Sequence, residues 1–321
     1  IINMRWLKHG KIFDPTDYAL PVGGFGFSQS PQALILEDRI RVYFSTREKD
    51  ITGKFLSHVS FVDFDKKMKH IIGVAKKPVI NLGQLGCFDE HGIFPFNILK
   101  EENKILAYTT GWSRRVSVSA DASIGLAISY DNGLTFEKYG NGPIMSASLK
   151  EPFLVGDAFV KKYDNTFHMW YIYGTHWIQS KENTPPDRVY KIAHATSINA
   201  IDWDRNSKLI IPDKLDSNEC QALPTVLKIR EKYHMYFCYR PAYGFREKNH
   251  LSYRLGYAYS DDLKTWIRDD EKAGIDISSN GWDSEMQSYP HLFECDGIIY
   301  MLYNGNEFGR YGFGLATLVQ Q

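Results

Sequence analysis

Hydrophobic positions along the chain occur in short alternating runs and brief apolar stretches, each followed by a cluster of turn residues. No segment keeps an apolar stripe at 3.6-residue spacing over three helical turns. The segment PQALILEDRIRVYF is typical, because two apolar runs flank the polar turn EDR. The pattern therefore predicts an all-β chain.

These strand pairs repeat along the chain. Five segments share a small or turn-forming opening, an apolar strand, a polar turn and a second strand rich in Tyr, Phe and Met. Their anchor positions are Pro31, Pro95, Asp157, Pro224 and Pro290, which gives successive steps of about 64, 62, 67 and 66 residues. This period suits a four-stranded blade with long loops. We predict a five-bladed β-propeller with four-stranded antiparallel blades, and one domain over 1–321.

Third strands and a closing strand are also visible. Three of the third strands end in a polar turn followed by Phe136, Trp203 or Trp266, which we expect to pack between neighbouring blades. A single blade cannot bury both faces of its sheet, so the blades should stack around an axis. The last segment, YGFGLATLV, should complete the fifth blade against the N-terminal region.

Charge and composition narrow the classes of partner. Lys plus Arg equals Asp plus Glu at 38 each, which argues against charge-driven binding of nucleic acid or of a membrane surface. The four cysteines lack metal-binding spacing, and no apolar run is long enough to span a membrane. The N-terminal residues lack the shape of a signal peptide, so we expect a cytoplasmic protein. Nothing in the sequence indicates which oligomeric state the protein adopts.

Carboxylates recur where the innermost strands should begin. Glu90, Glu219 and Glu285 each lie five residues before the proline of their blade, and Asp157 takes the proline position in the third blade. Such a group of like charges costs energy unless a substrate, a cation or raised pKa values relieve it. We predict that these four residues are catalytic, with hydrogen-bonded or solvated carboxylates as the alternative.

Paired carboxylic acids in a pocket with aromatic walls suit the cleavage of a glycosidic bond. One acid protonates the leaving oxygen, and the other activates water or attacks the anomeric carbon. Aromatic rings stack on sugar faces, while His, Asn and Gln bind hydroxyl groups. The predicted substrate-binding residues are Gln29, Arg47, His91, Trp112, His176, Trp177, Arg240, Tyr289 and Asn304.

Arginine at the strand ends raises the question of a charged substrate. Arg47, Arg114 and Arg240 present forks suited to a carboxylate or a phosphate, so an anionic or phosphorylated sugar is one interpretation. Salt bridges to the nearby acids are the other. No cofactor is required, but Ca²⁺ at the propeller axis is a candidate where the carboxylates and His91 converge. We predict no other metal site.

Two segments resemble strands of the five-bladed propeller glycosidases, the superfamily of arabinanases, β-xylosidases, invertases and levansucrases. They read VGDAFVKKYDNTFHMWYIYG and NECQALPTVLKIREKYHMYFCY, and the likeness extends over nearly the whole chain. The resemblance implies that Glu219 is the general acid and that Asp157 orients this acid and tunes its pKa. Glu219-Cys220 is also similar to the Glu-Cys pair of the invertase branch.

The first blade departs from that family pattern. The resemblance implies an Asp immediately before the proline, as base or nucleophile, but the chain reads Gln29-Ser30-Pro31. Three explanations are open. Glu90 or Glu285 takes over the role of base or nucleophile, or Asp14 or Asp17 reaches the site from the N-terminal loop. In the third, the site binds sugars without cleaving them. We expect a relocated carboxylate.

The sequence thus predicts a glycoside hydrolase-like enzyme. Its last blade resembles propeller proteins of bacterial surface-polysaccharide gene sets, which implies a related sugar. The alternatives are a glycoside phosphorylase or transferase with an arginine-lined anion site, a non-catalytic carbohydrate-binding propeller, and a protein-docking platform.

Overall fold

The computed structural model describes residues 3–320, which form three four-stranded sheets and one eight-stranded sheet that consists of two four-stranded units. In chain order, the first four-stranded unit contains β2 (Gln29–Ile35), β3 (Ile40–Lys49), β4 (Phe55–Phe64) and β5 (Ile71–Val74), and the second contains β6 (Gly92–Glu101), β7 (Lys104–Arg114), β8 (Ala120–Ser129) and β9 (Glu137–Lys138). The third contains β10 (Val155–Tyr163), β11 (Thr166–Ile178), β12 (Asp187–Ser197) and β13 (Asp204–Arg205), and the fourth contains β14 (Cys220–Ile229), β15 (Lys232–Arg240), β16 (Arg254–Ser260) and β17 (Ile267–Arg268). The fifth contains β18 (Ser288–Cys295), β19 (Ile298–Asn304), β20 (Phe313–Leu318) and β1 (Trp6–Phe13).

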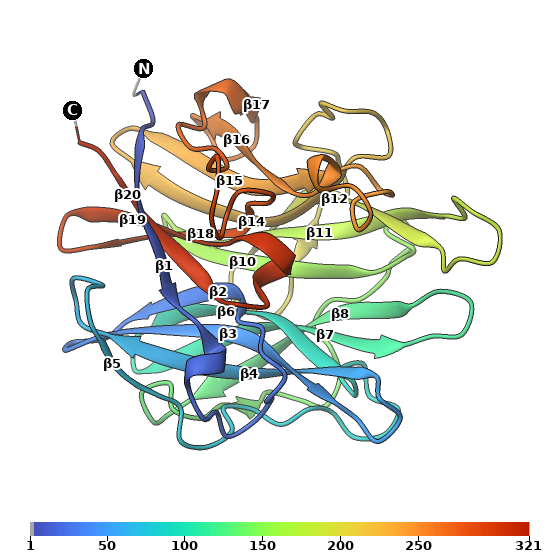
Figure 1. Cartoon of the computed structure of the whole chain (residues 1–321), viewed down its shortest axis with the longest axis horizontal. Coiled ribbons are helices and arrows are strands. Elements are labelled where there is room, and N and C mark those ends of the chain that lie inside the picture. The colour runs from blue at the N-terminus through green and yellow to red at the C-terminus, as the bar shows by residue number, and fades with distance from the viewer. Residues whose placement is uncertain (1–2, 321) are drawn as a thin grey trace.

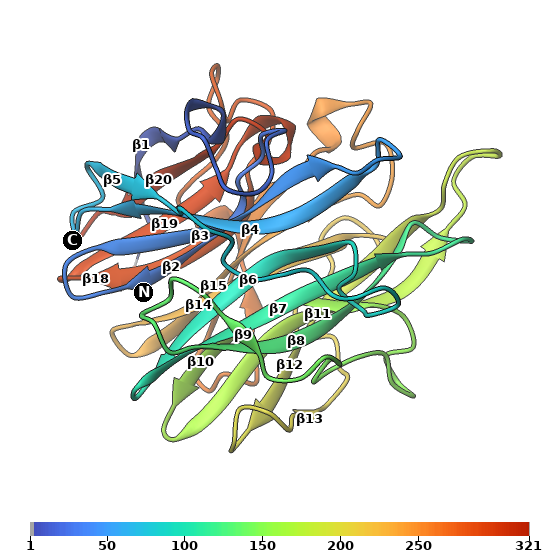
Figure 2. The ribbon, with the colours of Figure 1, turned by 90° about the horizontal axis from the view of Figure 1, so that it is seen from below.

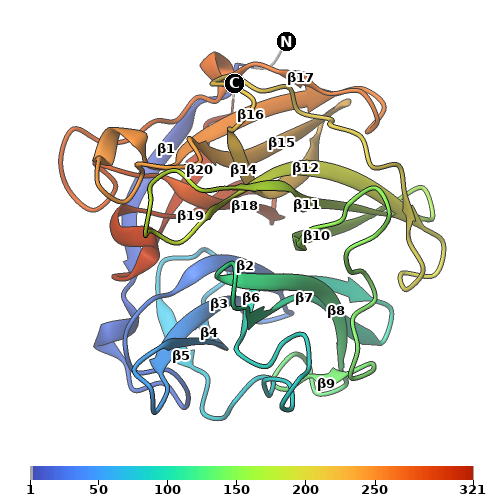
Figure 3. The same cartoon turned by 90° about the vertical axis from the view of Figure 1, so that its right-hand side faces the viewer.

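Strands within each four-stranded unit pair in antiparallel fashion. A single parallel bridge, between Ser57 and Gly92, joins the first two units at their edges. Short 3₁₀ helices lie in the connections: η1 (Pro15–Asp17), η2 (Asn249–Leu251), η3 (Asp270–Lys272) and η4 (Asn306–Gly309). Figures 2 and 3 show the sheets following one another in chain order. The prediction of an all-β propeller with four-stranded antiparallel blades is confirmed.

No helix in the described part of the chain is long and apolar enough to cross a membrane.

The first and last strands of the chain close the ring. β1 pairs with β20, in a register that runs from Trp6 opposite Leu318 to Phe13 opposite Phe313, and the two lie side by side in Figure 1. The Trp6 indole Nε1 donates a hydrogen bond to the hydroxyl of Tyr236 in the fourth blade at 2.9 Å. The prediction that the C-terminal segment completes the fifth blade against the N-terminal region is confirmed.

Aromatic side chains fill the spaces between neighbouring blades. Phe136 of the second blade packs edge-on against Tyr43 of the first, with ring centroids 5.8 Å apart. Trp203 packs against Tyr108 at 5.9 Å. The corresponding residue of the fourth blade, Trp266, packs against a buried tryptophan of the third blade at 6.2 Å. The prediction for these three positions is confirmed, because each aromatic ring after a polar turn buries apolar surface between two sheets.

Every innermost strand carries the same bulge. Its two unpaired positions are Ser30-Pro31, Phe94-Pro95, Asp157-Ala158, Leu223-Pro224 and Tyr289-Pro290. At four of these sites the first residue has a positive φ, which is 53° at Asp157 and 54° at Ser30. Asp157 therefore corresponds to the residue before the proline, and the sequence alignment that put it at the proline was wrong by one residue. A bulge re-aims a side chain, and here it turns this position toward the mouth of the propeller.

Ring closure predicts a sensitive glycine. Gly274 has φ +73°, and a Cβ built on it overlaps the carbonyl oxygen of Met4, just before β1. Because neither backbone can yield cheaply, we expect Gly274→Ala to lower the free energy of unfolding by at least about 2 kcal/mol. Urea denaturation measures this. Gly73→Ala is the control, since Gly73 has open space around it and no positive φ; equal effects of the two substitutions would contradict the prediction.

Candidate functional site

All five blades contribute to a cavity of about 910 Å³ at the mouth of the propeller. Its lining includes Gln29 of the first blade, Phe94 of the second, Asp157 of the third, Leu223 of the fourth and Tyr289 of the fifth. Four of these five are bulge residues, so the repeated backbone irregularity shapes the floor. The volume is in the range of small-molecule binding sites.

Asp157 is the buried acid of this cavity, with 6% of its surface exposed. Its backbone N–H donates to Thr110 Oγ1 at 2.8 Å, and its Oδ2 accepts the backbone N–H of Leu223 at 3.1 Å. Burial raises the pKa of Asp157 to about 7, against the opposing effects of the Leu223 N–H and the charge of Arg188. A carboxyl group with this pKa is protonated in about half of the molecules at pH 7, which suits a general acid.

The remaining charges in the cavity are mostly positive. Among the described residues, Asp121 and Asp157 are the carboxylates of the lining, against seven lysine and arginine side chains. We name four of these the arginine cluster: Arg47, Arg188, Arg240 and Arg246.

Arg47 stands at the end of β3 and contacts rings instead of carboxylates. Its guanidinium carbon lies 4.1 Å from the ring centroid of Phe27 and 5.1 Å from that of Phe55. Burial lowers the pKa of Arg47, and the charge of Arg246 lowers it further. Aromatic faces stabilise a cation only in part, so this side chain retains the capacity to bind an anion.

Arg240 is a buried cation, with 5% of its surface exposed. Its Nη1 donates to the carbonyl oxygens of Pro241 at 2.9 Å and Ala242 at 3.2 Å, and Nη2 donates to the Tyr190 hydroxyl at 3.0 Å. The guanidinium carbon lies 3.6 Å from the ring centroid of Phe245, and Nε has no partner within residues 3–320. A buried charge without a counter-charge is costly, and an anion bound in the cavity would lower that cost.

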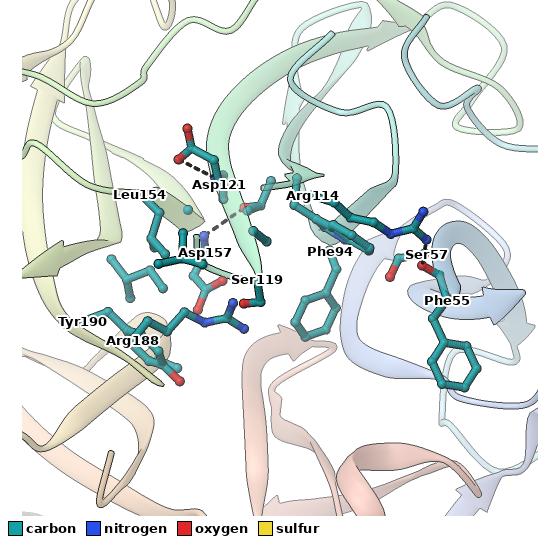
Figure 4. Close-up of a pocket in the computed structure, with 18 of the residues that line it drawn as sticks. Phe55, Ser57, Phe94, Arg114, Ser119, Asp121, Leu154, Asp157, Arg188 and Tyr190 are labelled. Atoms are coloured by element: carbon teal, nitrogen blue, oxygen red, sulfur yellow. Dashed lines mark hydrogen bonds between the residues drawn. The ribbon is translucent and has the colours of Figure 1, made fainter. Parts of the chain in front are cut away.

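Arg188, the second residue of β12, and Arg246, in the loop after β15, complete the cluster. Within the described residues the guanidinium of Arg188 has no hydrogen bond and no ion pair, and Figure 4 shows it beside Asp157 and Ser119. Arg246 has one acidic neighbour, Asp187, at 3.7 Å. Burial lowers the pKa of Arg246, and Arg240 and Arg188 lower it further. The mutual repulsion of these cations favours binding of an anion.

The structure brings some of the predicted site residues together. Asp157 and five predicted substrate-binding residues line the cavity, whereas Trp177 lines a second cavity beside it. The five are Gln29, Arg47, Trp112, Arg240 and Tyr289.

Glu219 lies elsewhere, in a buried ion pair. Its carboxylate is fully buried and contacts the Arg268 guanidinium at 2.7 Å. It also accepts a hydrogen bond from Gln221 Nε2 at 3.0 Å and does not line the cavity. The general-acid role that the resemblance implied does not agree with this geometry, because both oxygens are occupied by the protein and no substrate can reach them.

The other predicted carboxylates also lie outside the cavity lining. Glu285 is exposed, and Glu90 accepts the backbone N–H of Gly86 at 3.1 Å in the loop before β6. All three glutamates precede their strands, because β6, β14 and β18 begin after them. A position five residues before the proline therefore lies outside the bulge that faces the axis.

Three predicted sugar-binding residues instead form hydrogen bonds within the protein. His91 Nδ1 accepts the backbone N–H of Arg114 at 3.1 Å, and His176 Nε2 lies 3.0 Å from Asn218 Oδ1. Asn304 is fully buried and donates to the carbonyl oxygens of Ser28 and Gly312 at 2.9 Å each. None of the three lines the main cavity.

The N-terminal loop does not supply the carboxylate that was expected to replace the first-blade aspartate. Asp14 caps η1 by accepting the Thr16 backbone N–H at 3.0 Å, and Asp17 is exposed. Arg114 forms the salt bridge that was its alternative interpretation, with Asp50 at 2.8 Å. Within residues 3–320, no group of three or more His, Cys, Asp or Glu side chains could hold a metal ion.

The sequence interpretation missed the loops between the second and third strands of the blades. The segments that contain these loops read RRVSVSAD from the end of β7 into β8, ENTPPDR from the loop after β11 into β12, and RPAYGFREKNH from the end of β15 onward. They supply Arg188, Arg246, Ser119 and Asp121 to the cavity. Their length and their content of Arg, Ser and Pro were a usable signal, since functional residues concentrate in long loops.

The fold and the cavity define a class: a five-bladed propeller like those of glycoside hydrolases. The chain is similar to a solved structure described as a glycoside hydrolase, with a TM-score of 0.73 and 16% identity over 98% of this chain and 92% of that one. It is also similar to a thermostable family-43 glycoside hydrolase (TM-score 0.64, 17% identity, 94% and 91% covered). An endo-arabinase from Bacteroides thetaiotaomicron gives a TM-score of 0.62 at 11% identity, with 95% and 98% covered. At these identities the likeness shows the fold.

The chain belongs to the same protein family as two Mycobacterium tuberculosis proteins. It is 32% identical to the uncharacterized proteins MT1551 and Rv1502, over 98% of this chain and 99% of each relative. No protein-family model matches the chain.

Proposed function

We propose that this protein is a glycoside phosphorylase, which transfers a glycosyl group to phosphate. One observation carries the proposal: a buried, protonatable Asp157 faces a cavity whose other charges are almost all cationic. In this assignment Asp157 is the general acid, and Arg47, Arg240 and Arg246 of the arginine cluster bind phosphate.

The chemistry balances without a second protein carboxylate. A phosphate oxygen forms a bond to the anomeric carbon while the glycosidic carbon–oxygen bond breaks. The Asp157 carboxyl transfers its proton to the leaving oxygen, and the proton lost by the phosphate returns to Asp157 through solvent. The products are a glycosyl phosphate and a free hydroxyl on the leaving sugar. The guanidinium groups orient the phosphate and offset its negative charge.

Hydrolysis would need a second carboxylate to activate water. The remaining acid of the described lining is Asp121, whose Oδ1 accepts the backbone N–H of Ala122 at 2.9 Å. Figure 4 shows the Asp121 carboxylate turned away from Asp157. The position that carries Asp in the resembling glycosidases is Ser30, which is buried and accepts a hydrogen bond from Gln32 Nε2 at 3.3 Å. This arrangement supports an external anion as the nucleophile.

A second candidate function is carbohydrate binding without catalysis. Ser30 in place of an aspartate and Glu219 in an ion pair leave Asp157 as the one carboxylate at the described bulge positions. A sugar-binding propeller would need no more than this.

Phosphate dependence separates these functions. We expect that a panel of aryl glycosides and oligosaccharides yields a sugar 1-phosphate, detected by mass spectrometry, only when phosphate is present. Omission of phosphate should lower the rate at least about tenfold, because no protein group replaces the nucleophile. Release of free sugar at the same rate without phosphate, abolished by Asp121→Asn, would indicate hydrolysis. Binding of a sugar without any product would indicate the second function.

A further inference from the structure

A second cavity of about 710 Å³ adjoins the first, between the third and fourth blades. The two share lining residues from the segments that join the second and third strands of three blades, so the same side chains form the wall of both. The shared residues are Ser119, Pro185, Pro186, Arg188, Arg240, Phe245 and Arg246. A ligand that fills the first cavity can therefore extend past Arg188 into the second.

The second cavity has the side chains that a sugar requires. Trp177, at the end of β11, is partly buried against the core and lines this cavity, and an indole ring is a side chain on which sugars stack. Asn218 is oriented by His176, whose Nε2 lies 3.0 Å from Asn218 Oδ1. The amide nitrogen of Asn218 has no hydrogen-bond partner within residues 3–320, so it is available for a hydroxyl group.

Positive charge is again in excess. Among the described lining residues there are five cations and three carboxylates. Glu247 pairs with Lys181 at 3.3 Å, and Asp187 lies 3.7 Å from Arg246. Over the same described range, Lys248 and Arg188 form no ion pair. The cavity therefore has uncompensated cations on the side nearest Asp157 and in the loop after β15.

We propose that the second cavity binds the leaving-group side of an acidic oligosaccharide. A sugar ring stacks on Trp177, and a carboxylate or phosphate substituent contacts the unpaired cations Arg188 and Lys248. The assignment as the leaving-group side rests on the proposed function, because the leaving oxygen must lie at Asp157 and Arg188 is the charged neighbour of that acid. The substrate class is thus an oligosaccharide with a negative charge beyond the cleaved bond.

Binding tests this proposal without any turnover. The wild-type protein is applied to an array of neutral, uronic acid-containing and phosphate-bearing oligosaccharides, together with the variants Trp177→Ala and Lys248→Gln. We expect retention of acidic oligosaccharides and not of their neutral counterparts, and loss of affinity by about tenfold in Trp177→Ala. Tyr130→Ala is the control, since Tyr130 is an exposed aromatic residue outside both cavities.

The outcomes separate the two proposals. Stronger retention of uronic acid or of phosphate identifies the anion. Equal retention of neutral oligosaccharides, no retention, or unchanged binding by both variants would overturn the second-cavity assignment. Lys248→Gln keeps the test valid if Trp177→Ala folds poorly. Acidic binding without phosphate-dependent turnover would leave the binding cavity in place and remove the phosphorylase.

Discussion

Asp157→Asn should lower kcat by two to four orders of magnitude, which is the usual contribution of a general acid. The amide keeps the shape of the carboxyl group and its contact with the Leu223 N–H, but it has no proton to give to the leaving oxygen. The loss should be larger for sugar leaving groups than for acidic phenols, because a good leaving group needs little protonation. Initial rates with both kinds of glycoside measure the difference.

The pH profile of the wild-type protein should report the same group. Burial raises the pKa of Asp157 to about 7, so the protonated acid is depleted as pH rises above 7 and turnover should fall with it. Glu285→Gln is the matched control, because Glu285 is an exposed carboxylate outside the cavity lining. A comparable rate loss in both variants, or an unchanged rate in Asp157→Asn, would contradict the assignment.

Stability provides an independent readout of this acid. A pKa raised from 3.8 to about 7 means that the folded protein holds the proton more tightly than the unfolded chain. The contribution of the protonated Asp157 to the free energy of unfolding is fully present below pH 4 and is lost as pH rises through about 7. Relative to the wild type, Asp157→Asn should therefore gain at most about 4 kcal/mol at pH 8 and almost nothing at pH 4. A higher free energy of unfolding at pH 8 would also show that an inactive Asp157→Asn protein is folded.

Glu219→Gln should lower the free energy of unfolding by about 3 kcal/mol while leaving the turnover of the folded protein within a few fold. Removal of one partner from a buried ion pair leaves an uncompensated charge, which typically costs 3–5 kcal/mol. Arg268 keeps a contact with Asp270 at 3.0 Å, which argues for the lower end of that range. Urea denaturation and the rate per folded molecule measure the two effects.

The control for Glu219 is an exposed ion pair. Glu247 and Lys181 lie 3.3 Å apart with about two thirds of each side chain exposed, so Glu247→Gln should change stability by less than about 1 kcal/mol. If Glu219→Gln were as stable as the wild type and inactive, Glu219 would be the general acid after all.

The fold was predictable because local sequence patterns that repeat along the chain specify it. Alternating strands, polar turns and inter-blade aromatic residues such as Phe136 each reflect burial of apolar surface, which depends on residue type more than on fine geometry. Ring closure followed from the same argument, since unpaired outer strands must be covered.

The site was only partly predictable, and the bulge explains why. A shift of one residue between Ala158 and Asp157 decides which side chain faces the axis, and no propensity marks that shift in a blade without proline. The family likeness placed the acid at Glu219, whereas the outer strand β17 brings Arg268 close enough to neutralise it. Arg47 and Arg114 stand at equivalent strand ends. Arg114 forms an ion pair with Asp50, whereas Arg47 lies over the ring of Phe27.

The sequence by itself determined the all-β propeller architecture and the closure by the N-terminal strand, and it identified Asp157 as one of four candidate catalytic carboxylates. Only the tertiary structure decided the charge of the site, because salt bridges between segments far apart in the chain neutralise Glu219 and Arg114 and leave Arg47, Arg188 and Arg240 without an ion pair among the described residues. The physical reason is that burial and pairing act over a few ångströms in space, and those distances are set by the loops that fold over the mouth of the propeller.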